Sequence, residues 1–199
     1  MKTKTLLLSA AVVTVASFGA SPTAAHAQDT KVQPRASSIT TAAPVAKKSP
    51  MNSTSLRTED GYARIVYSQP MLRGRDMLGD QVAYGKVWRF GANEATEIFL
   101  TEELEINDDT ELPAGAYAIF CIPSADAWTL VFNRGLGEWG AYNYDESMDV
   151  ARVTLPVQAS DEAYEAFTIY FEDVPDSDED KLVVAWGNSK VEAMVEFDD

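Results

Sequence analysis

From about residue 56 onward, hydrophobic and polar residues alternate with a period of two rather than 3.6. This alternation is typical of β-strands with one buried face. The segments are short and rich in β-branched and aromatic residues, and clusters of Gly, Pro, Asn, Asp or Ser separate them. The expected strands are Tyr62–Tyr67, Val87–Phe90, Glu97–Thr101, Leu104–Ile106, Ala116–Ile122, Trp128–Asn133, Val150–Val157, Ala166–Phe171, Leu182–Trp186 and Val191–Phe197.

Strands of this length with frequent turn signals predict one all-β domain over residues 55–199. We expect a single antiparallel β-sandwich, jelly-roll-like or immunoglobulin-like, with few or no helices. Helical periodicity is scarce, and only Asp161–Ala166 is suited to a helical turn or two. The sequence contains no internal repeat and no second hydrophobic core.

The N-terminal residues have a different pattern. A short basic start precedes an apolar run from Leu6 to Phe18, and Ala25-His26-Ala27 matches the small-x-small sequence before a signal-peptidase cut. The apolar run is shorter than the ~18–20 residues that cross a bilayer. We therefore predict a signal peptide over residues 1–27, export to the periplasm or the medium, and no membrane insertion after cleavage. Residues 28–54 are rich in Ser, Thr, Ala and Pro and are expected to form a flexible leader.

Cleavage would remove His26, the one histidine of the chain. The mature protein would then lack the base of a Ser-His-Asp triad and any His-ligated metal site. The single cysteine, Cys121, excludes an intramolecular disulfide and lies in an apolar strand, so we expect a buried, unreactive thiol. We predict neither a metal nor a cofactor.

The charge balance is strongly acidic, with 16 basic and 31 acidic residues and a formal net charge of −15. Such a surface repels phosphate backbones, which argues against nucleic-acid binding. The imbalance is concentrated in residues 91–199, where four cations face 26 carboxylates. The cations gather instead at Arg64, Arg73, Arg75, Lys86 and Arg89. They either pair with acidic strands elsewhere or form an anion-facing patch, and the sequence leaves both interpretations open.

Two short motifs resemble known sites but lack the required context. The glycines of Gly135–Gly140 match GxGxxG, yet no helical pattern follows, so a glycine-rich surface loop is the better interpretation. Asp176–Asp180 resembles the start of a calcium loop, but the positions that need Gly and Glu are Lys181 and Gly187. A solvated acidic loop is favoured there, and calcium binding by residues 173–180 stays open.

The richest stretch for chemistry is Tyr84–Thr96, which combines two cations, a tryptophan, an asparagine and a glutamate. One interpretation is a strand that ends in a turn, with Trp88 in the core and Asn93 bonded to a loop backbone. The other is a loop that presents polar groups beside an aromatic wall, as in a polar-ligand pocket. The candidate ligand-binding residues are Arg75, Lys86, Trp88, Arg89, Asn93, Glu94, Trp139, Tyr142 and Tyr144.

The same residues carry a resemblance to a known family. Tyr67-Ser68-Gln69-Pro70, Gly74-Arg75 and the stretch from Tyr84 to Thr96, with its Trp-Arg-x-Gly-Ala-Asn core, resemble DUF2911. Leu112–Tyr117, Phe132-Asn133 and Trp139–Tyr144 follow in the family's order, so the resemblance covers about residues 55–197. It implies a secreted bacterial all-β protein of unestablished function. Gln69 departs from the family's Tyr-Ser-Arg-Pro pattern, which implies a weaker anionic part of any ligand site there.

Three functions remain as hypotheses. The first is a non-catalytic module that binds a glycan or small polar ligand, with the tryptophan and tyrosine rings as stacking faces and Arg89, Asn93 and Glu94 as hydrogen-bonding groups. The second is a carboxylate-dependent hydrolase of glycosidase type, for which Glu94 with Asp145 is the first pair to inspect. The third is an envelope scaffold without a small ligand.

Overall fold

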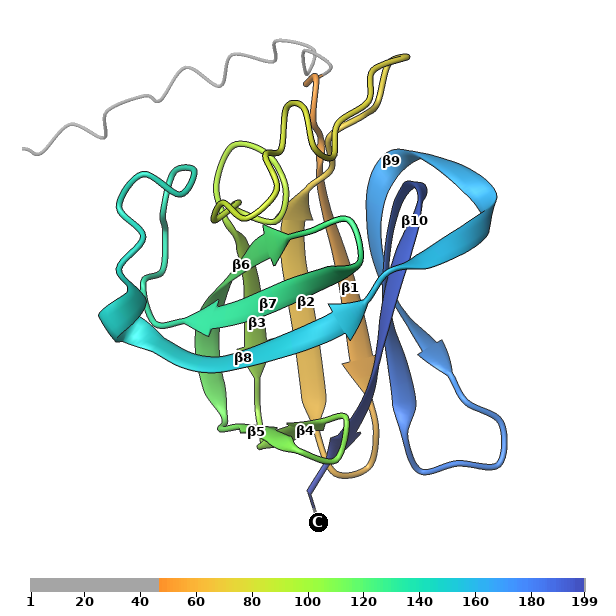
Figure 1. The fold of residues 1–199 in the computed structure, drawn as a ribbon. Helices are drawn as coiled ribbons and strands as arrows, with labels where there is room; N and C mark the ends of the chain where they lie inside the picture. Colours follow the sequence, from red (N-terminus) through yellow and green to blue (C-terminus); the bar gives the residue numbers. More distant parts are fainter. Residues whose placement is uncertain (1–46, 199) are drawn as a thin grey trace, which may run out of the picture. The chain divides into compact units, whose positions relative to one another are not determined.

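The computed structural model describes residues 47–198, which form two antiparallel sheets packed face to face (Figure 1). The six-stranded sheet has the order β1-β2-β3-β6-β7-β8, and the four-stranded sheet has the order β5-β4-β10-β9. The strands are β1 (Met51–Arg57), β2 (Tyr62–Ser68), β3 (Thr96–Leu100), β4 (Leu104–Ile106), β5 (Thr110–Leu112), β6 (Gly115–Pro123), β7 (Ala127–Asn133), β8 (Asp149–Pro156), β9 (Gln158–Asp173) and β10 (Asp180–Phe197), with a 3-10 turn, η1 (Glu146–Met148), before β8. The all-β sandwich expected from the alternation is confirmed.

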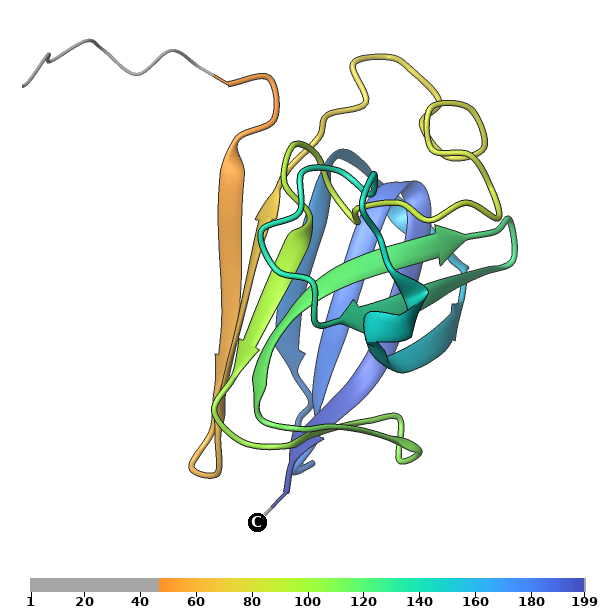
Figure 2. The ribbon, with the colours of Figure 1, turned by 90° about the vertical axis from the view of Figure 1, so that its left-hand side faces the viewer.

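The core lies between the two sheets, whose ribbons face each other in Figure 2, and in most strands buried side chains alternate with exposed or half-buried ones. In β2, for example, Ala63, Ile65 and Tyr67 are buried, whereas Arg64 is exposed. Aromatic rings occupy the centre: Trp88 stacks on Trp186 with ring centroids 5.6 Å apart. This packing fixes the positions of the loops that leave the sheet ends.

A smaller apolar cluster lies on the outer face of the six-stranded sheet. It contains Ala95, Ala118, Phe120 and Val131, which alternate with residues of the main core. The connection between β7 and β8 covers it, because the ring of Tyr144 contacts Phe120 edge to face at 5.0 Å. This long connection is therefore held against the sheet rather than extended into solvent.

Four expected elements differ from the structure. Val87–Phe90 is not a strand: only Trp88 bridges to Cys121, because Phe90 adopts φ +52° and turns the chain away. Asp161–Ala166 is not helical but belongs to β9, which pairs with β10 around a bulge at Gly187. Leu182–Trp186 and Val191–Phe197 are likewise parts of one strand, β10.

The N-terminal boundary of the domain also differs from the expectation. β1 begins at Met51, inside the segment expected as a leader, and pairs with β2 over its whole length from Met51–Ser68 to Arg57–Tyr62. Backbone pairing rather than side-chain burial holds this strand, since Leu56 is its one buried residue. The predicted signal peptide and the leader up to residue 46 lie outside the described residues. No helix in residues 47–198 is long and apolar enough to cross a membrane.

Candidate functional site

A single backbone bridge brings two predicted site residues together. Glu94 precedes β3 and Trp139 follows β7, and they form an isolated antiparallel bridge. The Ala95 amide donates to the Glu138 carbonyl (2.8 Å), and the Gly140 amide donates to the Asn93 carbonyl (3.0 Å). Glu94 and Trp139 are thus a directly opposed pair that lies between these two bonds, an arrangement that places opposing side chains close together on one side.

This bridge borders a hollow of about 350 Å³, which we call the Trp139 hollow. The indole of Trp139 is 59% exposed, and the exposed Glu94 carboxylate makes no hydrogen bond or ion pair with any described residue. The hollow combines a free aromatic face, a free carboxylate and two ammonium groups. Its lining residues are Lys47, Lys48, Ser49, Met51, Ser68, Asn93, Glu94 and Trp139.

Asn93 holds the edge of the Trp139 hollow in place. Its backbone has φ +60°, a left-handed conformation that asparagine tolerates. Its side-chain amide donates to the Ser68 hydroxyl (3.2 Å) and to the Ser49 carbonyl (3.4 Å). Arg73 donates to the Lys48 carbonyl at 2.7 Å. The side chains of Asn93 and Arg73 therefore fix the segment of Lys47 and Lys48 beside Trp139.

A second, smaller hollow lies around Arg89 and Tyr142. It has a volume of about 240 Å³ and is lined by Val87, Trp88, Arg89, Ala141 and Tyr142. We call it the Arg89 hollow. The side chains of Arg89 and Tyr142 both approach Gly140. A Cβ atom added to Gly140 would lie 2.8 Å from the Tyr142 ring and 3.5 Å from Arg89 Nη1. Gly140 also adopts φ +79°, so this close approach requires glycine.

The cations between Lys47 and Arg89 make no ion pair within the described residues. The ion pairs among the described residues involve Arg152, Lys181 and Lys190 instead. Of the two interpretations of the clustered cations, pairing with acidic strands is therefore wrong for residues 47–198. Arg73 and Arg75 instead donate to backbone carbonyls, and Arg57 lies over the Tyr62 ring at 4.3 Å.

Several predicted site residues are structural. Trp88 is 8% exposed, and its indole N–H donates to the Gly91 carbonyl at 3.0 Å, so its ring is not a free stacking face. The Tyr144 hydroxyl donates to Asp149 at 2.7 Å, and burial together with this carboxylate raises the pKa of Tyr144 to about 12. Asp145 accepts hydrogen bonds from Ser147 at the start of η1 and lines neither hollow, so it does not pair with Glu94.

Arg75 and Lys86 lie away from both hollows. Arg75 donates to the Leu72 and Met71 carbonyls and lines a separate hollow of about 580 Å³ beside Trp186. Lys86 is exposed in the loop before Trp88. The structure therefore brings together Asn93, Glu94 and Trp139 in one hollow and Arg89 and Tyr142 in the other.

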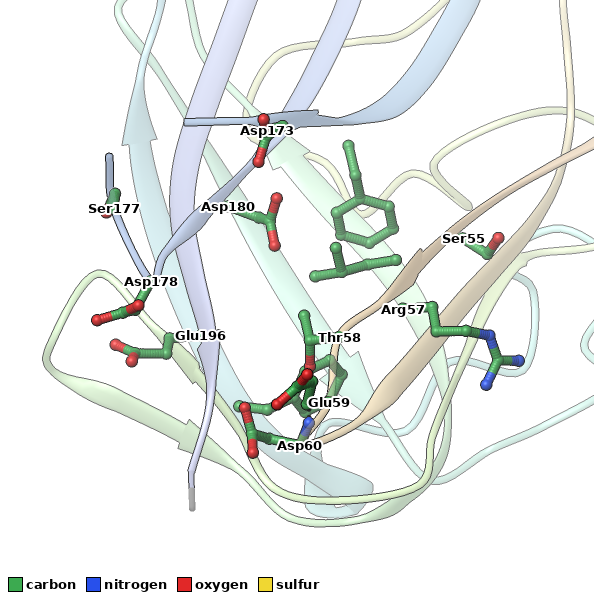
Figure 3. A pocket seen from close by; sticks show the side chains of 13 residues that line it. Ser55, Arg57, Thr58, Glu59, Asp60, Asp173, Ser177, Asp178, Asp180 and Glu196 are labelled. Atoms are coloured by element: carbon green, nitrogen blue, oxygen red, sulfur yellow. Dashed lines mark hydrogen bonds between the residues drawn. The ribbon is translucent and has the colours of Figure 1, made fainter. Parts of the chain in front are cut away.

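A further hollow, larger than the others described above, was not predicted from the sequence. It measures about 770 Å³ and lies between the β1–β2 turn and the β9–β10 connection (Figure 3). Burial and the neighbouring Asp173 raise the pKa of Asp180 above its ordinary value. The runs of acidic residues in both turns were visible in the sequence, but their proximity depends on the pairing of the sheets. The carboxylates that line this hollow are Glu59, Asp60, Asp173, Asp178, Asp180 and Glu196.

Neither metal nor thiol chemistry gains support from the geometry. Within residues 47–198, no group of three His, Cys, Asp or Glu side chains is placed to hold a metal ion, and this includes the acidic loop 173–180. Cys121 is fully buried, as expected, and burial raises the pKa of its thiol. The Gly135–Gly140 motif lies in a loop that opens no helix, which confirms that interpretation as well.

The fold and the site define a β-sandwich domain that carries an open polar hollow, with an exposed tryptophan, on the loops at one end of its sheets. The family model for DUF2911, described as a protein of unknown function, matches residues 49–195. The chain belongs to this family, as its motifs predicted. No curated protein and no solved structure matches the chain.

Proposed function

We propose that the protein is an exported, non-catalytic module that binds a glycan or another small polar ligand in the Trp139 hollow. The exposure of Trp139 carries this proposal, because the other three tryptophans are at most 8% exposed. An exposed indole is unfavourable because it leaves apolar surface in contact with water. It also offers a flat face on which a sugar ring can stack. A hollow of about 350 Å³ lies within the size range of small-ligand sites.

The polar groups around Trp139 suit hydroxyl-rich ligands. The Glu94 carboxylate accepts hydrogen bonds, while Lys47 and Lys48 donate them, and none of the three is engaged in an ion pair within the described residues. Asn93 and Ser68 already bond to each other, so they shape the wall rather than wait for a ligand. The hollow thus offers a stacking face with directional partners at its edge.

The binding test uses a panel of mono- and oligosaccharides, followed by Trp fluorescence and titration calorimetry. Trp139→Ala should weaken binding by about tenfold or more, equivalent to ~1.4 kcal/mol. Phe99→Ala is the matched control, because Phe99 is also exposed but lies on β3 outside the hollow. The proposal fails if no member of the panel binds, or if Trp139→Ala binds as the wild type does.

A hydrolase is the second candidate, and one observation favours it. A neighbouring hollow of about 230 Å³ is lined by both Glu94 and Glu97, and the Glu97 carboxylate accepts from the Gly137 amide at 2.7 Å. Glycoside hydrolysis requires two carboxyl groups on either side of the scissile bond, and this hollow has two. Release of reducing sugar that disappears in both Glu94→Gln and Glu97→Gln would support catalysis. Binding without release supports the module.

A further inference from the structure

We infer that the Arg89 hollow is an anion-binding subsite, and that the ligand is an acidic glycan carrying a carboxylate or sulfate group. This inference rests on the proposed function and names the class of ligand. It goes beyond that function because it assigns a role to Arg89 and Tyr142, which do not line the Trp139 hollow.

The first step is the proximity of the two hollows along the chain, although they share no lining residue. Both border the same pair of segments, which the Gly140–Asn93 and Ala95–Glu138 backbone hydrogen bonds join. Trp139 and Tyr142 are three positions apart in the chain, so their Cα atoms lie at most about 11 Å apart. This backbone separation is within the span of a short oligosaccharide.

The second step is the state of Arg89. Its side chain makes no hydrogen bond with a described residue, and no described carboxylate oxygen lies within 4.0 Å of its guanidinium nitrogens. Its Nε atom is buried without an acceptor among these residues, whereas the side chain as a whole remains partly exposed. A cation held half-buried without a partner is unfavourable unless a ligand supplies the anion.

The third step is the match between this side chain and an oxyanion. The planar guanidinium can donate two parallel hydrogen bonds to a carboxylate or sulfate. The Tyr142 ring is 83% exposed and lies against Gly140 beside Arg89 Nη1, where it offers a face for the sugar that carries the anion. Lys47 and Lys48 add positive charge at the Trp139 hollow.

The net charge limits the size of the ligand. Residues 91–199 carry four cations against 26 carboxylates, so most of the domain repels a long polyanion. A single anionic group on a short glycan meets only the local cations. The geometry therefore points to an acidic oligosaccharide or chain end rather than to a nucleic acid.

The direct test is a titration with simple anions that does not depend on the identity of the glycan. Isotope-labelled protein is titrated with sodium sulfate and with sodium acetate at constant ionic strength, with sodium chloride as reference, while the Arg89 Nε–H resonance is followed. We expect a saturable shift with sulfate or acetate and none with chloride. The larger response identifies the group, sulfate ester or carboxylate.

Two variants assign the response to the site. Arg89→Gln removes the Nε–H reporter, so the Tyr142 ring resonances serve as the readout for the variants. They should shift with sulfate or acetate in the wild type and stay unchanged in Arg89→Gln. Arg64→Gln is the matched control, since Arg64 is an exposed β2 arginine without an ion pair among the described residues, and should leave the response intact. A chloride response as large as the others, or a response that survives Arg89→Gln, overturns the inference.

A comparison of two sugars links the subsite to the glycan. D-galacturonate and D-galactose share a ring and differ by one carboxylate, so galacturonate should bind about tenfold more tightly to the wild type and equally to Arg89→Gln. Equal binding of both sugars to the wild type refutes the acidic ligand but not glycan binding. A saturable anion response at Arg89 without any sugar response at Trp139 refutes the proposed glycan site instead.

Discussion

The charged residues of the two hollows differ in their partners from the charged residues around η1. Glu94 and Arg89 have no ionic partner among the described residues, whereas Arg152 lies 2.6 Å from Asp149 and 2.9 Å from Glu146. A charge that already has its partner stabilises the fold, and one without a partner remains available to a ligand. Stability measurements on single variants can distinguish the two cases.

The first prediction compares ligand-site residues with a core residue. Glu94→Gln and Arg89→Gln should leave the melting temperature unchanged or slightly raised, because neither side chain has a partner to lose. Trp88→Ala should cost ~3–5 kcal/mol, since it empties a buried site stacked on Trp186. Calorimetric melts of the three variants check this. A fall of many degrees for both polar variants would make Glu94 and Arg89 structural braces.

Sequence reasoning found these residues but could not sort them by role. Trp88 and Trp139 both stand beside a charged residue and near a glycine, so their local composition is alike. Their burial differs because Trp88 meets Cys121 of β6 and the Trp186 ring of β10, whereas Trp139 forms a backbone bridge to Glu94 and keeps its ring exposed. Those contacts are between residues far apart in the sequence, and alternation along a single strand carries no information about them.

The same limit applies to whole elements. Strong alternation predicted β2, β3, β6, β7 and β8 close to their observed bounds. β1 was missed because it is an edge strand with a single buried residue, so its side chains show no alternation. Val87–Phe90 was predicted as a strand from its residue types, but the positive φ of Phe90 belongs to a loop whose shape depends on its neighbours.

At the scale of elements, the second prediction concerns the loop that carries Trp139. The Tyr144 hydroxyl donates to Asp149 and accepts from Arg152 at 3.0 Å, which fastens this loop to the outer sheet face. Tyr144→Phe should therefore lower the free energy of unfolding by about 1 kcal/mol in chemical denaturation. Tyr142→Phe is the control, because that hydroxyl has no hydrogen bond with a described residue and its ring is exposed. Equal stability of both variants would contradict this role of Tyr144.

The third prediction concerns the facing carboxylates of the β9–β10 hairpin. Asp173 and Asp180 are paired across the strands, and burial and Asp173 raise the pKa of Asp180. Because the folded pKa exceeds the unfolded one, the native state binds more protons in the interval between them. The ionised Asp180 carboxylate therefore lowers the free energy of unfolding most at neutral pH, and this penalty disappears as the group becomes protonated when the pH falls towards about 4.

Asp180→Asn should raise the melting temperature at pH 7 and have little effect near pH 4. Asp161 is an exposed residue of β9, so the control Asp161→Asn should leave the melting temperature unchanged at both pH values. Melts recorded across this pH range decide the matter, and a destabilised Asp180→Asn at pH 7 would mean that the carboxylate has a stabilising partner.

For the whole molecule, the fourth prediction concerns export. Cleavage between Ala27 and Gln28 should give an exported protein whose intact mass lacks residues 1–27, and those residues lie outside the described part of the chain. The mature protein would then contain no histidine. Retention of His26 in the exported protein would contradict this and would reopen the histidine-dependent mechanisms that the sequence otherwise excludes.

Charge is distributed unevenly over the described domain. β1 joins the two extremes: Met51 at its start lines the Trp139 hollow with Lys47 and Lys48, and Arg57 at its end lines the acidic hollow. Seven residues of strand separate them by roughly 20 Å, about twice the Debye length at 0.1 M salt. At moderate salt the two ends therefore act independently. Lys47 and Lys48 cannot relieve repulsion among the carboxylates of the 770 Å³ hollow, where Arg57 is the one cation among the lining residues.

The fifth prediction follows from this unrelieved repulsion. Residues 91–199 carry four cations and 26 carboxylates, and the described ion pairs engage only Arg152, Lys181 and Lys190. Counterions screen repulsion within the folded state more than in the expanded unfolded chain, so the melting temperature at neutral pH should rise with NaCl. Screening saturates once the Debye length falls below the spacing of the charges, so the rise should level off by about 0.3 M. A flat or falling melting temperature over that range would mean that the carboxylates are already neutralised by pairing or protonation.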